Sequence, residues 1–405
     1  MADDDMADDD MADPGFGLFD CDNHIYEPPE AGTKHMPAAM LDRAIAPVTL
    51  PNGKQGLLAG GQVITSLDHD IDKAHAPGSL REVLRQMRSG NPDASYDLEP
   101  FRPEWLEREP RLALMDAQGV ESAIMYPGAV GLLAEAYVQG VEPLYANLRA
   151  YNTWNDEVWG LNHQDRIYAP AVLSLRDLDH AVDELDRVLD LGARLILLHA
   201  GPAYGRSPGD PYFDPFWARV NEAKASIAFH IGEFWYNDTI APAWGMDPRP
   251  VILEMSAWQW QHTYGVRPVE ETLSALIFDN LFGRFPAIHV VVSEYGAEWV
   301  PIFVKHMDKA RGMGRRGPWI GGKLSERPSA IFRRHVRVTP YPEDDVIKIV
   351  NDLGQLDSIV MGSDYPHAEG FAEPREFASL IGDLSADEQR RILRDNALVL
   401  VGRES

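Results

Sequence analysis

The chain has 405 residues, of which 45% are hydrophobic and 25% are charged, so its composition excludes a largely disordered protein and supplies a sizeable core. Acidic residues outnumber basic ones by 63 to 37, and the net charge of −26 opposes a nucleic-acid partner. The single cysteine, Cys21, excludes an intramolecular disulfide and is typical of a reducing compartment. Without an apolar run of about 18 residues or a basic-then-apolar start, we expect a cytoplasmic protein with no membrane partner.

The first 13 residues form an acidic segment in which residues 1–5 are repeated as residues 6–10. Seven of these 13 residues are aspartates, and clustered like charges with little apolar material predict a disordered tail. An acidic interaction tail is the functional alternative, whereas a duplicated start without a role is the simpler interpretation. We therefore divide the chain into a tail at 1–13 and one folded unit at 14–405.

From residue 16 onward, short β-rich runs alternate with helical patterns. The predicted strands are residues 19–24, 122–126, 167–173, 195–199, 226–230, 288–294, 336–339 and 358–363. The predicted helices are residues 110–118, 144–162, 178–191, 216–224, 269–285, 299–311, 343–353, 373–381 and 387–401. Eight strands alternating with helices predict an α/β fold, a (β/α)8 TIM barrel, whose chemistry lies at the C-terminal ends of the strands.

Two insertions interrupt this alternation. Asn52-Gly53 stands between apolar runs, which predicts a hairpin, so residues 46–66 should form a small β insertion after strand 1. Residues 231–268 follow strand 5 as a long βα loop, and seven of the 31 residues at 234–264 are aromatic, against 9% in the whole chain. We expect this loop to cover the active site and to favour a flat or apolar substrate, although a structural tryptophan cluster or an oligomer contact is the alternative.

Residues that can bind a metal stand at the ends of three predicted strands. Asp22 and His24 end strand 1 and share a face because side chains alternate along a strand. His230 ends strand 5, and Asp364 follows strand 8 after Gly362-Ser363. Two carboxylates and two imidazoles at one end of a barrel predict a site for Zn²⁺, Mn²⁺ or Fe²⁺ with positions left for water or substrate.

These motifs resemble the amidohydrolase superfamily, in the branch that contains aminocarboxymuconate-semialdehyde decarboxylase and γ-resorcylate decarboxylase. The resemblance rests on residues 20–28 (DCDNHIYEP), 206–211 (RSPGDP), 229–230 (FH), 294–301 (EYGAEWVP) and 362–367 (GSDYPH). It implies a distorted (β/α)8 barrel with long βα loops and one divalent ion held by Asp22, His24, His230 and Asp364. It also implies a homodimer or a higher homo-oligomer.

Two positions depart from the pattern of the decarboxylases in this branch. Many of them begin with His-x-His, whereas Asp22 stands at the first ligand position here and adds negative charge that favours Mn²⁺ over Zn²⁺. At the end of strand 6, where the relatives carry an acid/base histidine, this chain has Glu294. Glu294 is therefore our candidate acid/base, with orientation of a water molecule or a structural role as alternatives.

Other residues in the βα loops are candidates for contact with the substrate. His199 ends strand 4 and His367 follows the strand 8 ligand, so each is a candidate catalytic residue, although a hydrogen-bonded structural histidine is equally consistent. Arg206 and Arg267 can clamp a substrate carboxylate, with a surface ion pair as the alternative for each. Trp235, in the aromatic loop, is a candidate substrate-binding residue.

Our first functional hypothesis is a metal-dependent, non-oxidative decarboxylase of a small aromatic or unsaturated carboxylic acid that needs no organic cofactor. Glu294 or His367 would protonate the carbon that bears the carboxylate. The second hypothesis is a hydrolase that cleaves a C–C, amide or ester bond with a metal-activated water, with Glu294 as the base. The third hypothesis is a barrel that binds an aromatic ligand around a structural metal without turnover. It predicts an ion with no open coordination position.

Overall fold

The computed structural model describes residues 15–403 except 29, 52, 54, 60–61, 67–72, 92, 233 and 251–254, and it does not describe the side chains of 64–66, 234 and 235. The acidic tail predicted at 1–13 lies outside the described residues. Among the described residues, no helix is both long enough and apolar enough to cross a membrane.

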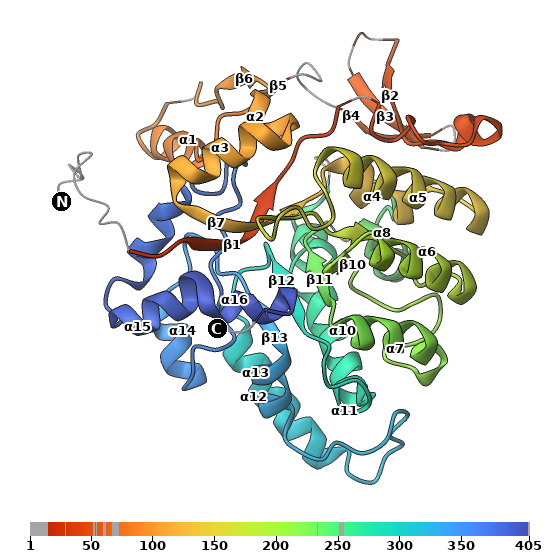
Figure 1. Ribbon diagram of the computed structural model, residues 1–405, viewed down its shortest axis with the longest axis vertical. Coiled ribbons are helices and arrows are strands. Elements are labelled where there is room, and N and C mark those ends of the chain that lie inside the picture. The colour runs from red at the N-terminus through yellow and green to blue at the C-terminus, as the bar shows by residue number, and fades with distance from the viewer. Residues whose placement is uncertain are drawn as a thin grey trace.

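Parallel strands form the centre of the molecule, with helices around them (Figure 1). One ladder joins β1 (Leu18–His24), β7 (Val120–Tyr126) and β8 (Ile167–Tyr168). The other joins β9 (Ala171–Val172), β10 (Leu195–Leu197), β11 (Ser226–His230), β12 (Val290–Ser293) and β13 (Val336–Val338). β8 and β9 are the two halves of the strand predicted at 167–173, and Pro170 separates them because proline has no N–H to donate to a ladder.

The strand predicted at 358–363 is not a regular strand, but it closes the ring between β13 and β1. On one side, Val360 N–H donates to the carbonyl of Val338 at 3.1 Å, and on the other Cys21 N–H donates to the carbonyl of Met361 at 2.9 Å. A Cβ on Gly362 would come within 2.6 Å of the Asp22 Cβ, so only glycine lets this segment pass so close to β1. The fold is therefore a distorted (β/α)8 barrel.

Helices cover the outside of the barrel (Figure 1). The longer ones are α3 (Arg108–Gln118), α5 (Val141–Val158), α6 (Leu178–Asp190), α7 (Asp214–Ala223), α10 (Arg267–Phe278) and α12 (Val300–Met313), and α14 (Val346–Leu353) is shorter. The shorter ones include α4 (Ala129–Tyr137), α11 (Leu281–Arg284), α13 (Pro328–His335), α15 (Ala386–Arg390) and α16 (Asn396–Leu398). The helix predicted at 269–285 is two helices, because Asn280 adopts a left-handed conformation with φ of 56° between α10 and α11.

The C-terminal helices differ from the prediction in their type and bounds. The helix predicted at 373–381 is a 3₁₀ helix at Pro374–Ile381. The helix predicted at 387–401 is a series of short helical turns that begins with α15 and ends with a 3₁₀ turn at Val399–Val401. The sequence pattern did not separate these helix types, because the 3₁₀ helix and the turns at 391–401 both bury apolar residues, such as Phe377 and Ile392, in the core.

The insertion predicted at 46–66 is an antiparallel sheet of three strands, β2 (Ala46–Thr49), β3 (Gln55–Ala59) and β4 (Gln62–Ser66), which projects at the top right of Figure 1. Beyond it, β5 (Lys73–His75) pairs with β6 (Leu98–Pro100), near α1 (Leu80–Arg88) and α2 (Pro103–Leu106). The loop predicted at 231–268 folds into α8 (Phe234–Ile240), a 3₁₀ turn at Ala241–Trp244, α9 (Ala257–Gln259) and a π-helical turn at Trp260–Tyr264. The described aromatic side chains of this loop, such as Tyr236 and Trp260, therefore stand on short helical segments.

A buried carboxylate fixes the closure of the barrel. The Asp20 Oδ1 accepts hydrogen bonds from the backbone N–H of Ser363 at 2.9 Å and of Asp22 at 3.1 Å. Its Oδ2 accepts from the Ser363 hydroxyl at 2.5 Å and from the Asn23 amide at 2.9 Å. Burial raises the pKa of Asp20 to about 6, although the four hydrogen bonds act in the opposite direction. Asp20 thus holds the end of β1 against the closing segment, residues 358–363.

We expect Asp20→Ala to lower the free energy of unfolding by about 3 kcal/mol, because several buried donors lose their acceptor. Urea denaturation of the variant and the parent protein measures this difference. Asp190→Ala, which removes an exposed carboxylate on α6, serves as the control and should change the value by less than about 0.5 kcal/mol. Equal effects of the two substitutions would show that Asp20 does not hold the barrel closed.

Candidate metal centre

Carboxylates and imidazoles converge at the C-terminal end of the barrel. Asp22 and His24 come from β1, and His230 ends β11. Glu294 directly follows β12, and Asp364 and His367 follow residues 358–363, the segment that closes the barrel. Asp22, His24, His230 and Glu294 form one group whose ligand atoms all lie within 4.8 Å of one another. A second group, which overlaps the first, meets the same limit and consists of His24, Glu294, Asp364 and His367. This is the end of the barrel where the sequence predicted the metal.

The His24 imidazole lies at the middle of this cluster. Its Nε2 is 3.2 Å from the Nε2 of His230, 3.3 Å from Oδ1 of Asp364 and 3.5 Å from Oδ1 of Asp22. The His230 Nε2 lies 3.0 Å from Oε2 of Glu294 and 3.6 Å from Oδ1 of Asp22. The four predicted ligands are therefore brought together, and Glu294 joins them.

The hydrogen bonds around the cluster leave its ligand atoms facing inward. The carbonyl of Ile231 can only accept, so the Nδ1–H of His230 donates to it at 2.9 Å and the Nε2 lone pair points at the cluster. The Asp22 Oδ1 is buried and has no hydrogen-bond partner among the described residues. A buried carboxylate oxygen without a hydrogen bond, beside two imidazole nitrogens, fits a divalent ion, and this donor set suits Mn²⁺, Zn²⁺ or Fe²⁺.

The electrostatics of the cluster also call for a cation. Burial raises the pKa of Glu294 and raises the pKa of Asp364 well above its usual range. Burial acts in the same direction on Asp22, but contacts with His230 and His24 hold the pKa of Asp22 below its usual range. Three carboxylates this close repel one another when ionised, and a bound cation removes that repulsion.

Two of the acidic residues have strained backbones. Glu294 has φ of 59° and Asp364 has φ of 56°, which is the left-handed region that residues other than glycine rarely adopt. At Glu294 the N–H donates to Oγ1 of Thr339 at 3.2 Å, and the carbonyl accepts from the Tyr341 hydroxyl at 2.7 Å. These bonds hold the conformation that aims the Glu294 carboxylate at His230. Such strain is common at functional sites.

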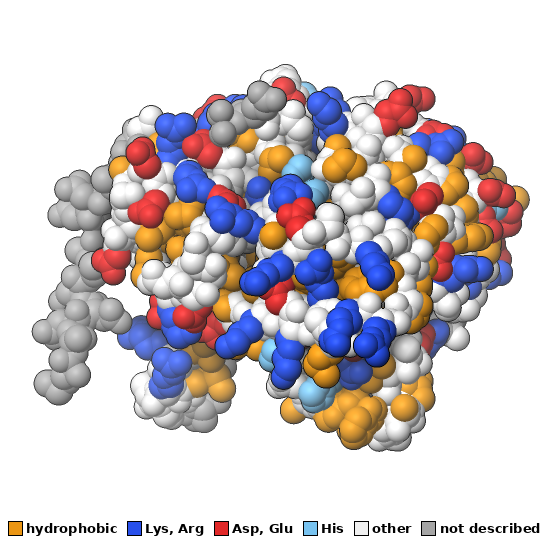
Figure 2. Space-filling view, turned by 90° about the horizontal axis from the view of Figure 1, so that it is seen from below, with side chains coloured by type: hydrophobic (Ala, Val, Ile, Leu, Met, Phe, Trp, Pro, Cys, Tyr) orange, Lys and Arg blue, Asp and Glu red, His pale blue; other side chains and the backbone are white. Residues whose placement is uncertain are grey.

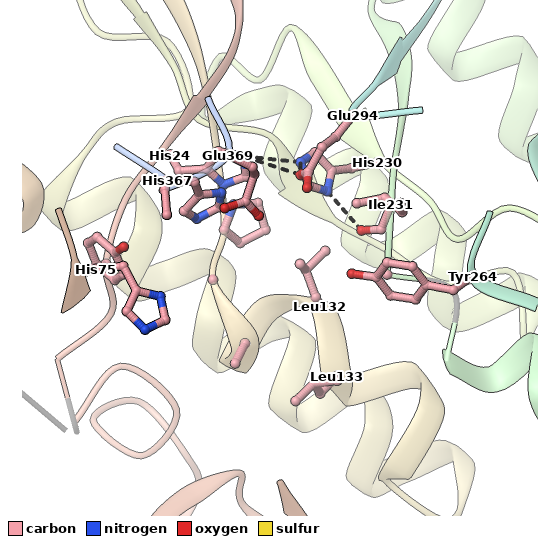
Figure 3. A pocket seen from close by; sticks show the side chains of 16 residues that line it. His24, His75, Leu132, Leu133, His230, Ile231, Tyr264, Glu294, His367 and Glu369 are labelled. Carbon is pink, nitrogen blue, oxygen red and sulfur yellow. Dashed lines mark hydrogen bonds and ion pairs between the residues drawn. The ribbon is translucent and has the colours of Figure 1, made fainter. Parts of the chain in front are cut away.

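The cluster of carboxylates and imidazoles is open to two cavities. One, of about 340 Å³, exposes His24, His230, Glu294 and His367 and has apolar walls that include Leu132, Leu133 and Ile231 (Figure 3). The other, of about 460 Å³, lies against Asp22 and Asp364 and is lined by Trp260, Tyr264 and Tyr341. Ile231, Tyr264, Glu294 and Glu369 line both cavities. A ligand can therefore reach the cluster from either cavity.

His367 lies at the cluster, as a candidate catalytic residue should. Its ring centroid is 4.0 Å from that of His24, and it lines the cavity of about 340 Å³. The Nδ1 of His367 is 2.7 Å from Oδ1 of Asp364. Burial lowers the pKa of His367, but the Asp364 carboxylate outweighs burial and raises the pKa to about 10.

Three other predicted site residues lie elsewhere. His199 lines a separate small cavity with Trp217 and Phe229. The Arg206 guanidinium stacks over the ring of Tyr212, 4.4 Å from its centroid, and lies 3.9 Å from Oδ2 of Asp210. Arg267 donates from Nε to Oε1 of Glu271 at 2.9 Å. These arginine contacts are the surface ion pairs that we considered as the alternative. The Trp235 side chain lies outside the described residues.

Sequence reasoning missed a buried arginine beneath the cluster. Arg111, on α3, is 1% exposed, donates from Nη2 to the carbonyl of His24, and lies over the ring of Tyr365 at 5.2 Å. The signal was present, because Arg111 shares a helical face with Met115 and Gln118, which are both buried. Sequence reasoning also missed Glu369, which lines both cavities, because no strand pattern marks the loop that carries it.

Comparison with known proteins places this chain in a family. The family model described as amidohydrolase matches residues 20–403. An amidohydrolase from Mycobacterium avium subsp. paratuberculosis K-10 is 32% identical, with a TM-score of 0.82 over 96% of this chain and 99% of that one. The chain therefore belongs to the amidohydrolase family, as its motifs predicted. No curated protein matches it.

More distant solved structures share the fold. One is 5-carboxyvanillate decarboxylase from Sphingomonas paucimobilis, with 17% identity and a TM-score of 0.61 over 95% of this chain and 99% of that one. Another is a dihydroxybenzoic acid decarboxylase from Polaromonas sp. JS666 with bound manganese and the inhibitor 2-nitroresorcinol. It is 20% identical, with a TM-score of 0.55 over 74% of this chain and 87% of that one. These similarities confirm the predicted barrel.

We expect alanine at Asp22, His24, His230 or Asp364 to lower the manganese content of the protein at least about tenfold after loading and desalting, because each change removes a ligand atom from the cluster. Elemental analysis gives the metal content, and circular dichroism checks that each variant is folded. Arg267→Ala, at the surface ion pair, should keep the parent content. Full occupancy in all four folded variants would disprove the ligand assignment.

Proposed function

We propose that this amidohydrolase is a metal-dependent, non-oxidative decarboxylase of an aromatic or unsaturated carboxylic acid. One observation supports the proposal: Glu294 and His367, two groups that can transfer a proton, line the same cavity as the proposed metal ligands His24 and His230. The decarboxylase structures that share the fold act on aromatic acids, by their names, and one of them holds manganese. Manganese is accordingly our preferred metal for this chain.

The shape of the cavity supports a flat substrate. Leu132, Leu133 and Ile231 supply apolar walls, and Tyr26 and Tyr264 supply aromatic ones. A volume of about 340 Å³ is at the small end of ligand sites and suits one substituted ring. The second cavity gives solvent or a product a separate place beside the cluster.

Asp22, His24, His230 and Asp364 would hold a divalent ion, which would supply positive charge for binding the substrate carboxylate. With the substrate so placed, Glu294 or His367 donates a proton to the ring carbon that bears the carboxylate. The bond between that carbon and the carboxylate then breaks, its electron pair returns to the ring, and CO₂ leaves. Solvent restores the proton to the donor, so one proton is consumed for each CO₂ released.

Glu294 also supports a second candidate function. A carboxylate 3.0 Å from His230 and aimed at the cluster is well placed to accept a proton from an attacking water, as a hydrolase of a C–C, amide or ester bond requires. Isotopes distinguish the two reactions. Decarboxylation in D₂O places deuterium on the carbon that lost CO₂, whereas hydrolysis in H₂¹⁸O places ¹⁸O in a new carboxylate.

We expect Glu294→Gln to lower kcat at least about 10²-fold for CO₂ release while the metal stays bound, because glutamine keeps the size of the side chain but cannot transfer the proton. The assay uses the manganese-loaded enzyme and the substrate that a panel of hydroxybenzoic and unsaturated acids reveals. Glu298→Gln, at an exposed glutamate four residues further on, should leave kcat unchanged.

Other outcomes of the same experiment contradict the assignment. Loss of metal together with activity would make Glu294 a ligand instead of a proton donor. Near-normal turnover would leave His367 as the proton donor. Release of CO₂ from no acid in the panel, together with ¹⁸O incorporation from an ester or amide panel, would replace the decarboxylase with the hydrolase.

A further inference from the structure

Helix α4 forms one wall of the cavity of about 340 Å³. Leu132 and Leu133, both on this helix, supply apolar surface to the cavity. The start of the helix lines the same cavity through Pro127, Gly128 and Ala129. Figure 3 shows Leu132 pointing from the helix into the cavity. The position of α4 therefore sets the distance between this wall and the cluster.

Glu27 holds the first turn of α4. It follows β1, three residues after His24, and its Oε2 accepts a hydrogen bond from the N–H of Val130 at 2.7 Å. Its Oε1 accepts from the N–H of Gly131 at 3.3 Å. Figure 2 shows acidic and basic side chains side by side on one outer face of the molecule, whereas Glu27 is bound by backbone N–H groups at a helix N-terminus, where a negative charge is favoured. Glu27 thus ties the strand that carries Asp22 and His24 to the wall of the cavity.

Glycines at the start of α4 make room for this contact. A Cβ on Gly128 would come within 3.1 Å of Oε2 of Glu27. A Cβ on Gly131 would come within 2.6 Å of the Pro127 Cβ and within 3.0 Å of the ring of Tyr151, which is buried on α5. Contacts this short would force one of the neighbours to move. The first turn of α4 is therefore closely packed between the Glu27 carboxylate and Tyr151.

The Glu27 carboxylate is ionised in weakly alkaline solution. Burial raises the pKa of Glu27 to about 7, although its hydrogen bonds, above all the one from the N–H of Val130, act in the opposite direction. The titratable group that faces it from α5 is Tyr151. The charge of Glu27 adds to the rise in the pKa of Tyr151, for which burial is the largest cause. At pH 8 the carboxylate therefore carries the charge that binds the helix, and the phenol is neutral.

We propose that Glu27 is a positioning residue, which fixes the first turn of α4, sets the apolar wall of the cavity and so gives the site its preference for a ligand with a ring. Glu27 does not itself line either cavity, so it acts through the helix. The inference rests on the proposed function in one respect, namely that the ring of the ligand occupies this cavity beside the metal.

Two hydroxamates test this role without turnover, because both carry the same metal-binding group and only one carries a ring. Benzohydroxamate and acetohydroxamate are titrated by calorimetry at pH 8 into the manganese-loaded full chain, and the ratio of their dissociation constants measures the contribution of the ring. We expect the parent protein to bind benzohydroxamate at least about tenfold more tightly, because the ring buries apolar surface against α4. Glu27→Gln should lower this ratio at least about threefold, while the affinity for acetohydroxamate and the manganese content stay within about twofold of the parent values.

Two further variants show whether the effect comes from the wall. Gly131→Ala keeps the Glu27 carboxylate but forces the first turn of α4 away from Pro127 and Tyr151, so it should lower the ratio to a similar extent. Asp177→Asn changes the carboxylate that caps α6, where Oδ1 of Asp177 accepts from the N–H of His180 at 3.1 Å, and it should leave the ratio unchanged. Because this change also weakens a helix cap, it controls for a loss of stability alone.

Other outcomes overturn the proposal. An unchanged ratio in folded, manganese-loaded Glu27→Gln would show that the wall does not depend on Glu27, and an equal loss in Asp177→Asn would show a general effect of stability. Equal weakening of both hydroxamates would place the effect of Glu27 at the metal. A parent protein without a preference for the ring would refute the inference together with the proposed ligand cavity. The expected ratios in a protein that releases CO₂ from no acid would instead contradict the decarboxylase function alone.

Discussion

The arrangement depends on repulsion between buried carboxylates that the fold holds together. Asp22, Glu294 and Asp364 surround two imidazoles at the end of the barrel, and burial raises the pKa of Glu294 and of Asp364. Nothing in the local sequence favours this grouping, because each carboxylate comes from a different strand end. A divalent cation is the partner that neutralises the ionised carboxylates of this group. These charges are the physical ground for the proposed metal centre.

Two buried groups outside the cluster keep it in place. Asp20 ties the end of β1 to the closing segment through Ser363, and Arg111 holds the backbone carbonyl of His24 from below. Both act on β1, the strand that carries Asp22 and His24. The ligand atoms are therefore held by rigid strand ends that hydrogen bonds brace from outside the cluster, as precise metal sites require.

The sequence predicted the parts of this site that follow from strand endings. Asp22, His24, His230 and Asp364 each end or follow an apolar run, and a barrel brings such ends together. The sequence could not predict that Glu294 and Asp364 adopt a left-handed backbone. It also could not predict that residues 358–363 close the barrel through hydrogen bonds outside a regular strand. Both features result from contacts between residues far apart in the chain. Arg206 and Arg267 were predicted from their place in loops and His199 from the end of a strand, and neither position alone determines where a side chain points. Glu369, in a loop without a strand pattern, left no signal of this kind.

The central claim is that one divalent ion binds among these side chains, and anomalous diffraction from a manganese-soaked crystal tests it most directly. We predict a single strong manganese peak about 2.0–2.3 Å from ligand atoms of Asp22, His24, His230 and Asp364, with Glu294 facing it. A strong peak elsewhere with none among these four residues would contradict the account, as would a crystal in which His24 and His230 point away from each other.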